Sequence, residues 1–120
     1  MTDYQLGALE SRFADVIWAN EPIASSELVK RSEELFGWKK STTYTVLKRL
    51  WEMGLFQNIK GTVTSLMSRS EFYSAKSERF VNESFNGSLP AFIAAFSRRN
   101  ALSPEDVAEL KRIVEEYGEG

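Results

Sequence analysis

Apolar residues recur every three to four positions through most of the chain, which is the spacing of amphipathic helices. The pattern predicts one helix within residues 6–18, before an Asn-Glu-Pro break, and a second that Ser25 or Ser26 can cap and that ends at Gly37. A third helix is predicted over residues 41–53, with Gly54 as its stop. The first half of the chain is therefore expected to contain three consecutive helices.

A change of period follows the third helix. In residues 55–67, β-branched and aromatic residues lie on both sides of Lys60-Gly61, which predicts a short β-hairpin with this dipeptide at its turn. Three helices followed by a hairpin form the order of a winged helix-turn-helix, in which the third helix enters the major groove of DNA. We predict a mainly α fold, with a winged-helix DNA-binding domain over residues 1–67 and the hairpin as its wing.

The second half of the chain is expected to be helical throughout. A capping box at Ser68 opens a fourth helix that ends before Gly87, Ser88 can cap a fifth, and the segment SPED at 103–106 starts a sixth. About 50 residues in three thin helices bury too little surface to be stable alone. Their aromatic faces either pack on the first half or are covered by a second copy of the chain. We favour the second copy, and predict that residues 68–120 form a helical dimerisation domain.

The composition removes several classes of chemistry. The chain of 120 residues has no cysteine and no histidine, which excludes disulfides, thiolate nucleophiles, Cys/His metal sites and imidazole acid–base catalysis. Its carboxylate pairs lie at helix first turns and on solvated faces, and no Gly-rich phosphate loop is present. We therefore expect no enzyme activity, no cofactor and no metal. Because no signal peptide or long apolar run is found, a cytoplasmic protein without a membrane partner is expected.

Positive charge is concentrated around the third predicted helix. The formal charge of the whole chain is −2, yet residues 38–60 hold five basic residues and one acidic residue. By contrast, residues 1–37 hold three basic and seven acidic residues. A local cationic segment in an acidic protein is typical of a nucleic-acid contact, although an imbalance over so short a segment also arises by chance.

The third helix has two different faces. One face carries the core candidates Thr43, Val46, Leu47, Leu50 and Met53. The other shows short hydroxyls, a tyrosine and cations, which can approach a duplex closely and bond phosphates or base edges. The alternative to a DNA contact is that this polar face and Lys60 of the wing are only exposed to solvent. The DNA-binding candidates are Lys39, Lys40, Ser41, Thr42, Tyr44, Thr45, Lys48, Arg49 and Lys60.

The sequence resembles the penicillinase repressor family of winged-helix transcriptional repressors over nearly its whole length. The resemblance rests on the segments LGALESRFADVIW (6–18), WKKSTTYTVLKRL (38–50), FNGSLPAFIAAF (85–96) and LSPEDVAELKRIVEE (102–116). It implies a homodimeric repressor, of a family that regulates antibiotic resistance, whose third helix binds a half-site of a palindromic double-stranded DNA operator. The resemblance and the closely spaced phenylalanines of the second half of the chain indicate the residues that contact the second copy. These dimerisation candidates are Phe80, Phe85, Leu89, Phe92, Ile93, Phe96, Leu110 and Val114.

Some positions depart from the family pattern. In the antibiotic-sensing branch a protease cleaves before a Phe in the segment that matches Ala95-Phe96, where Asn usually precedes the bond; a regulatory protease acting near Ala95-Phe96 is thus a candidate partner. The cysteine cluster of the copper-sensing branch is absent, which excludes copper sensing through it. Arg49 either anchors its helix to the domain or contacts a phosphate. The net acidity and a wing without the usual Arg and Tyr leave a winged-helix protein-interaction module without DNA binding as the alternative function.

Overall fold

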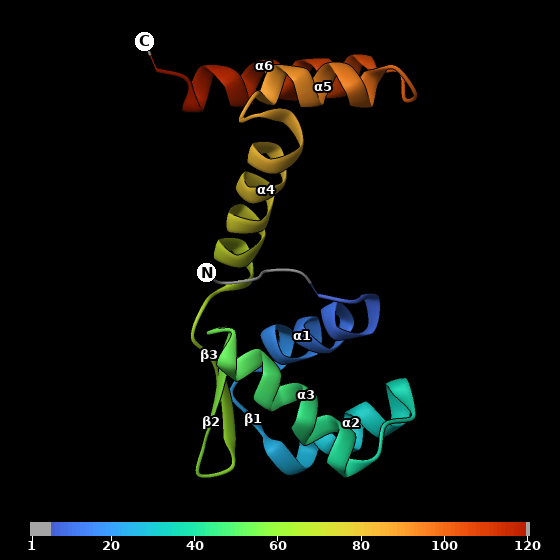
Figure 1. Cartoon of the computed structure of the whole chain (residues 1–120), viewed down its shortest axis with the longest axis vertical. Helices are drawn as coiled ribbons and strands as arrows, with labels where there is room; N and C mark the ends of the chain where they lie inside the picture. The colour runs from blue at the N-terminus through green and yellow to red at the C-terminus, as the bar shows by residue number, and fades with distance from the viewer. Residues whose placement is uncertain (1–5, 120) are drawn as a thin grey trace. The chain divides into compact units, whose positions relative to one another are not determined.

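The computed structural model describes residues 6–119 and contains six helices and three short strands in that range. They are α1 (Ala8–Asn20), β1 (Ile23–Ala24), α2 (Ser25–Phe36), α3 (Lys40–Glu52), β2 (Phe56–Ile59), β3 (Thr62–Ser65), α4 (Arg69–Phe85), α5 (Leu89–Ser97) and α6 (Pro104–Tyr117) (Figure 1). The predicted fold class is confirmed. The chain forms two compact units that divide between Glu78 and Arg79, within α4. The functional domain boundary at residues 67 and 68 stays a prediction.

The first unit encloses a hydrophobic core between its three helices and the sheet. The three helices and the two strands of the hairpin contribute the apolar positions that their sequence periods predict. The fully buried side chains of this core include Phe13, Ile17, Leu28, Leu50, Leu55, Phe56, Val63 and Phe72. Because α3 gives one face to this core, its opposite face is directed away from it.

The sheet has three antiparallel strands in the order β1-β3-β2. Ile59 is paired with Thr62, so Lys60 and Gly61 alone form the turn between β2 and β3. Their φ angles are 52° and 82°, the left-handed values that a type I′ hairpin turn requires at both positions. The hairpin prediction is confirmed. The strand β1 was not predicted, because two residues are too few to show a period of two.

Trp18 joins α1 to the sheet and to the beginning of α4. Its Nε1–H donates a hydrogen bond to the carbonyl oxygen of Met67 at 2.9 Å. Its ring centroid lies 5.0 Å from that of Phe56 and 5.6 Å from that of Phe72, the one buried residue of α4. A large aromatic ring with its N–H satisfied stabilises this junction, so the beginning of α4 is part of the winged-helix core.

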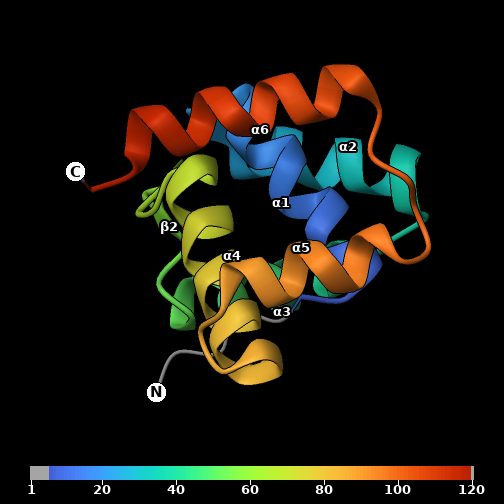
Figure 2. The ribbon, with the colours of Figure 1, turned by 90° about the horizontal axis from the view of Figure 1, so that it is seen from above.

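The second unit begins with the last turns of α4 and includes α5 and α6. The cap predicted at Ser88 is confirmed, since its Oγ accepts the amide of Ala91 at 3.1 Å. Ser103 caps α6 in the same way, because its Oγ accepts the amide of Asp106 at 3.0 Å. In the first unit, the cap predicted at Ser25 or Ser26 is wrong, because α2 begins at Ser25 and its N-cap residue is Ala24. α5 and α6 are joined by a loop and run antiparallel to each other (Figures 1 and 2). No helix in the described part of the chain is long and apolar enough to cross a membrane.

Aromatic rings hold the second unit together without forming a closed core. Phe80, Phe85 and Phe92 meet edge to face, with ring centroids 5.5 to 5.9 Å apart. In spite of these contacts, no residue of α5 or α6 is buried. The unit therefore exposes much of its apolar surface.

Candidate nucleic-acid interface

The helix α3 begins and ends one residue earlier than predicted, at Lys40 and Glu52. Its N-cap residue is Lys39, whose side chain makes no capping hydrogen bond, and its first turn contains no acidic residue. The free amide groups of a helix N-terminus attract anions, and α1, α2, α4 and α6 each carry an acidic side chain in the first turn. Here two lysines stand at that end instead, which favours a phosphate ligand over an internal cap.

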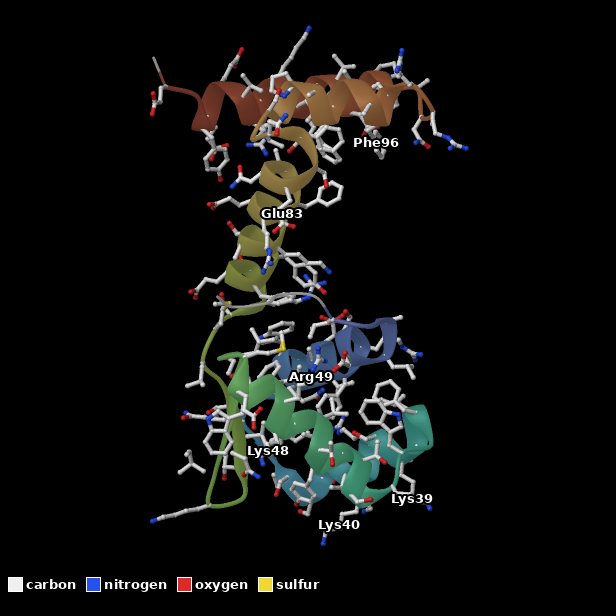
Figure 3. The ribbon with its side chains drawn as sticks, viewed as in Figure 1. Lys39, Lys40, Lys48, Arg49, Glu83 and Phe96 are labelled. Atoms are coloured by element: carbon white, nitrogen blue, oxygen red, sulfur yellow. The ribbon has the colours of Figure 1, made fainter. Side chains whose placement is uncertain are left out.

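The polar face of α3 is exposed along its length, whereas Thr43, Leu47 and Leu50 on the other face are buried. Figure 3 shows Lys39 and Lys40 at the start of the helix and Lys48 farther along it. Cations therefore lie at both ends of one surface, with hydroxyls between them. The DNA-binding candidates exposed on it are Lys39, Lys40, Ser41, Thr42, Thr45, Lys48 and Arg49.

Tyr44 differs from these residues because it is half-buried and its hydroxyl has a partner. Its Oη donates to Ser25 Oγ at 3.2 Å, and the amide of Ser25 donates to the carbonyl oxygen of Gly61 at 2.8 Å. Ser25 thus links α3 to the turn of the wing, where Lys60 is exposed. This link could not be predicted from the sequence, since it depends on three segments that meet only in the folded domain.

Arg49 forms an ion pair with Glu10 of α1. The other carboxylate oxygen of Glu10 accepts the amide of Gly7 at 3.1 Å, so the same side chain caps α1. Of the two roles considered for Arg49, the structure therefore shows that of an anchor between α3 and α1. Its side chain remains 47% exposed, and a contact with phosphate stays a prediction.

A cavity of about 590 Å³ opens beside the polar face, between α3 and β2. Its lining residues are Tyr44, Leu47, Lys48, Trp51, Glu52 and Asn58. Trp51 and Asn58 were not among the site residues predicted from the sequence, because nothing in the pattern of α3 or of the wing shows that they line one cavity. Within residues 6–119, no group of three or more acidic side chains is arranged to hold a metal ion.

The dimerisation candidates all lie in the second unit. Phe80, Leu89, Phe96 and Val114 are exposed by 49 to 65%, while Phe85, Phe92, Ile93 and Leu110 are half-buried. A groove of about 340 Å³ runs between α5 and α6, and four of the eight candidates line it: Phe92, Ile93, Phe96 and Leu110. The structure thus brings half of the candidates together in one place.

The order of the elements, the wing and the exposed face of α3 define a winged-helix protein with an appended helical region. Residues 6–116 match the sequence profile of the Penicillinase repressor family. The match spans almost the whole chain, and the protein belongs to this family.

Two kinds of relative resemble the chain over nearly their full length. The Penicillinase repressor of Bacillus licheniformis is 31% identical over 94% of this chain and 91% of its own length. The Methicillin resistance regulatory proteins MecI of Staphylococcus aureus and Staphylococcus epidermidis are 22% and 21% identical, each over 92% of this chain and 94% of their own. The similarity therefore includes the wing and the second unit as well as α3.

Proposed function

We propose that this protein is a transcriptional repressor that binds a palindromic DNA operator as a homodimer, with α3 in the major groove. Membership of the penicillinase repressor family supports repression, and the names of its relatives support a gene of antibiotic resistance as the target. The single observation that carries the DNA contact is the small, polar and cationic face of α3, exposed opposite a buried core face.

In this proposal the two ends of α3 bind the phosphate backbone and its middle contacts bases. Lys39 and Lys40 neutralise phosphates near the helix N-terminus, and Lys48 does so from the other end. Between them, Thr42 and Thr45 are short enough to let the helix approach the base edges. The Thr45 hydroxyl donates to the carbonyl oxygen of Ser41 at 2.9 Å, which leaves its methyl group available for a thymine methyl.

The wing supplies a contact outside the major groove. Lys60 is exposed at the turn, and the Tyr44–Ser25–Gly61 link fixes the position of that turn relative to α3. A lysine held at a fixed position beside α3 can bind a phosphate of the DNA backbone that flanks the major-groove contact. This contact would add to affinity on any sequence, because phosphates carry no sequence information.

The homodimer follows from the exposed apolar surface of the second unit. Contiguous apolar surface on a small protein usually marks an interaction site, and most homo-oligomers are two-fold symmetric. Phe96 and Val114, at 51% and 65% exposure, would be buried by a second copy. Two copies would present two α3 helices to half-sites about 34–36 Å apart, which suits a palindromic operator.

Fluorescence anisotropy with a labelled duplex from the region directly upstream of the protein's own gene tests the DNA contact. We expect saturable binding that weakens as salt rises, and weaker binding to a scrambled duplex of the same composition. Lys48→Ala should lower the salt dependence by about one phosphate contact, whereas Lys111→Ala, which removes the same charge from α6, should not. No binding at low salt would refute the proposal and favour the protein-interaction module.

The candidate partner that cleaves near Ala95-Phe96 stays a prediction. Both residues are exposed in the last turns of α5. The carbonyl oxygens of Ala95 and Phe96 accept amides of residues 98–100 at 3.1 to 3.4 Å, so the helix end has to unwind before a protease can bind this bond. Mass spectrometry of the chain after incubation with a candidate protease would identify the cut.

A further inference from the structure

We propose that the cavity between α3 and β2 binds a small aromatic molecule with one carboxylate and one N–H group, and that this ligand competes with DNA. The existence of the site is independent of the proposed function, and only the competition rests on it. The cavity belongs entirely to the first unit, since its lining residues all come from α3 and β2.

The walls of the cavity suit a planar apolar ligand. Its volume of about 590 Å³ is within the range of small-molecule sites, which are mostly apolar with a few placed polar groups. Trp51 lines it and is 41% exposed, whereas the two other tryptophans, Trp18 and Trp38, are half-buried. Together with the ring of Tyr44 and the side chain of Leu47, it offers surfaces on which an aromatic ring can stack.

The charged groups of the cavity define the ionic part of the ligand. Lys48 is exposed at its edge and can pair with a carboxylate. Glu52 lies one helical turn farther along and lines the same cavity, so it would repel a second negative charge. A monoanion is therefore favoured over a dianion or a phosphate ester.

Asn58 supplies the reason for an N–H group on the ligand. It lies on the same face of β2 as the buried Phe56, since side chains two positions apart on a strand point to the same face. Its Oδ1 is buried and accepts no hydrogen bond from any residue between 6 and 119. A buried acceptor without a partner is costly, and rotation of this amide towards a donor in the cavity would supply the missing bond.

Competition follows from the residues that the cavity shares with the proposed DNA surface. Lys48 cannot neutralise a phosphate while a ligand carboxylate holds it. Tyr44 also lines the cavity, and its hydroxyl holds Ser25 and thereby the turn of the wing. A ring stacked on Tyr44 would therefore affect both parts of the DNA surface.

Indole-5-carboxylate is a suitable probe, because its N–H and carboxylate lie at opposite ends of a planar ring system. In titrations of the full-length ¹⁵N-labelled protein, we expect saturable shifts of the Trp51 indole resonance and of the Asn58 amide, with those of Trp18 and Trp38 unmoved. Naphthalene-2-carboxylate, which lacks the N–H, should bind about tenfold more weakly. No saturable shift at millimolar probe, or shifts centred on residues 79–119, would overturn the site.

Variants distinguish binding of the probe in the cavity from non-specific binding to exposed apolar residues. Trp51→Ala should weaken the probe at least tenfold, and Lys48→Ala should weaken it as well. Leu35→Ala is the matched control, since Leu35 is an exposed apolar residue of α2 outside the cavity. If Leu35→Ala weakens the probe as much as Trp51→Ala does, the assignment to the cavity is wrong.

A second measurement tests competition alone. With the labelled upstream duplex, saturating probe should raise the apparent Kd of the wild-type protein several-fold and leave that of Trp51→Ala unchanged. Probe binding at Trp51 without any change in duplex affinity would overturn the competition. If the wild-type protein does not bind the duplex at all, the proposed function fails, and the resonance shifts still decide whether the cavity is a binding site.

Discussion

Thr43 is a polar residue on the buried face of α3. It is 1% exposed, and its Oγ1 has no hydrogen-bond partner among the residues that the structure describes. Thr43→Val keeps the shape and removes this hydroxyl, so we expect the free energy of unfolding to rise by about 1 kcal/mol, measured by urea denaturation. Thr45→Val, on the exposed face, should change stability by less than about 0.5 kcal/mol. A loss of stability in Thr43→Val would show that its hydroxyl is satisfied.

The ion pair between Arg49 and Glu10 makes a second prediction at the scale of residues. Both side chains are partly exposed, so Glu10→Gln should cost less than about 1 kcal/mol of stability. It releases the Arg49 guanidinium and removes a negative charge next to α3, so duplex affinity at low salt should increase by a few-fold. Anisotropy titrations of Glu10→Gln and Arg49→Ala measure this. If both variants bind the duplex like the wild type, Arg49 is only an anchor.

At the scale of elements, a single substitution in the wing can remove the charge of Lys60 and keep the hairpin turn intact. Lys60 adopts a φ of 52°, which asparagine tolerates better than lysine does. Lys60→Asn should therefore keep or slightly raise stability while it removes the charge. If Lys60 binds a phosphate, affinity should fall equally on specific and scrambled duplexes, and the salt slope should decrease by about one contact. An unchanged salt slope in a folded Lys60→Asn protein would exclude the wing contact.

The wing also shows how far the sequence could predict this fold. The hairpin was predictable because a Gly-containing dipeptide between β-branched runs determines a turn locally. Three other features were not predictable, because each depends on segments that are distant in sequence. They are the strand β1, the hydrogen bonds of Ser25 to α3 and the wing, and the cavity that Trp51 and Asn58 both line. The exposed face of α3 was predicted from its helical period, but the half-burial of Tyr44 was not, since its neighbours come from α2 and the wing.

For the whole molecule, the central question is what covers the apolar surface of the second unit. Sequence reasoning predicted that these helices would be too thin to close a core, and none of the residues of α5 and α6 is buried. The compact units divide within α4, because Phe72 near its start packs with Trp18 in the first unit. The interface between two copies is therefore expected to involve residues from position 79 onwards.

Phe96→Glu tests this expectation on the intact chain. A carboxylate at a position that a second copy buries would be desolvated without a partner, so the dimer should dissociate. We expect sedimentation to show a monomer at concentrations where the wild type is dimeric. The affinity for a two-half-site duplex should fall towards that for a single half-site, because each α3 then binds alone. Leu35→Glu is the matched control, since the exposures of Leu35 and Phe96 are 52% and 51%. A wild type that is monomeric while binding its operator tightly, or a Phe96→Glu protein that remains dimeric, would exclude this surface as the dimer interface.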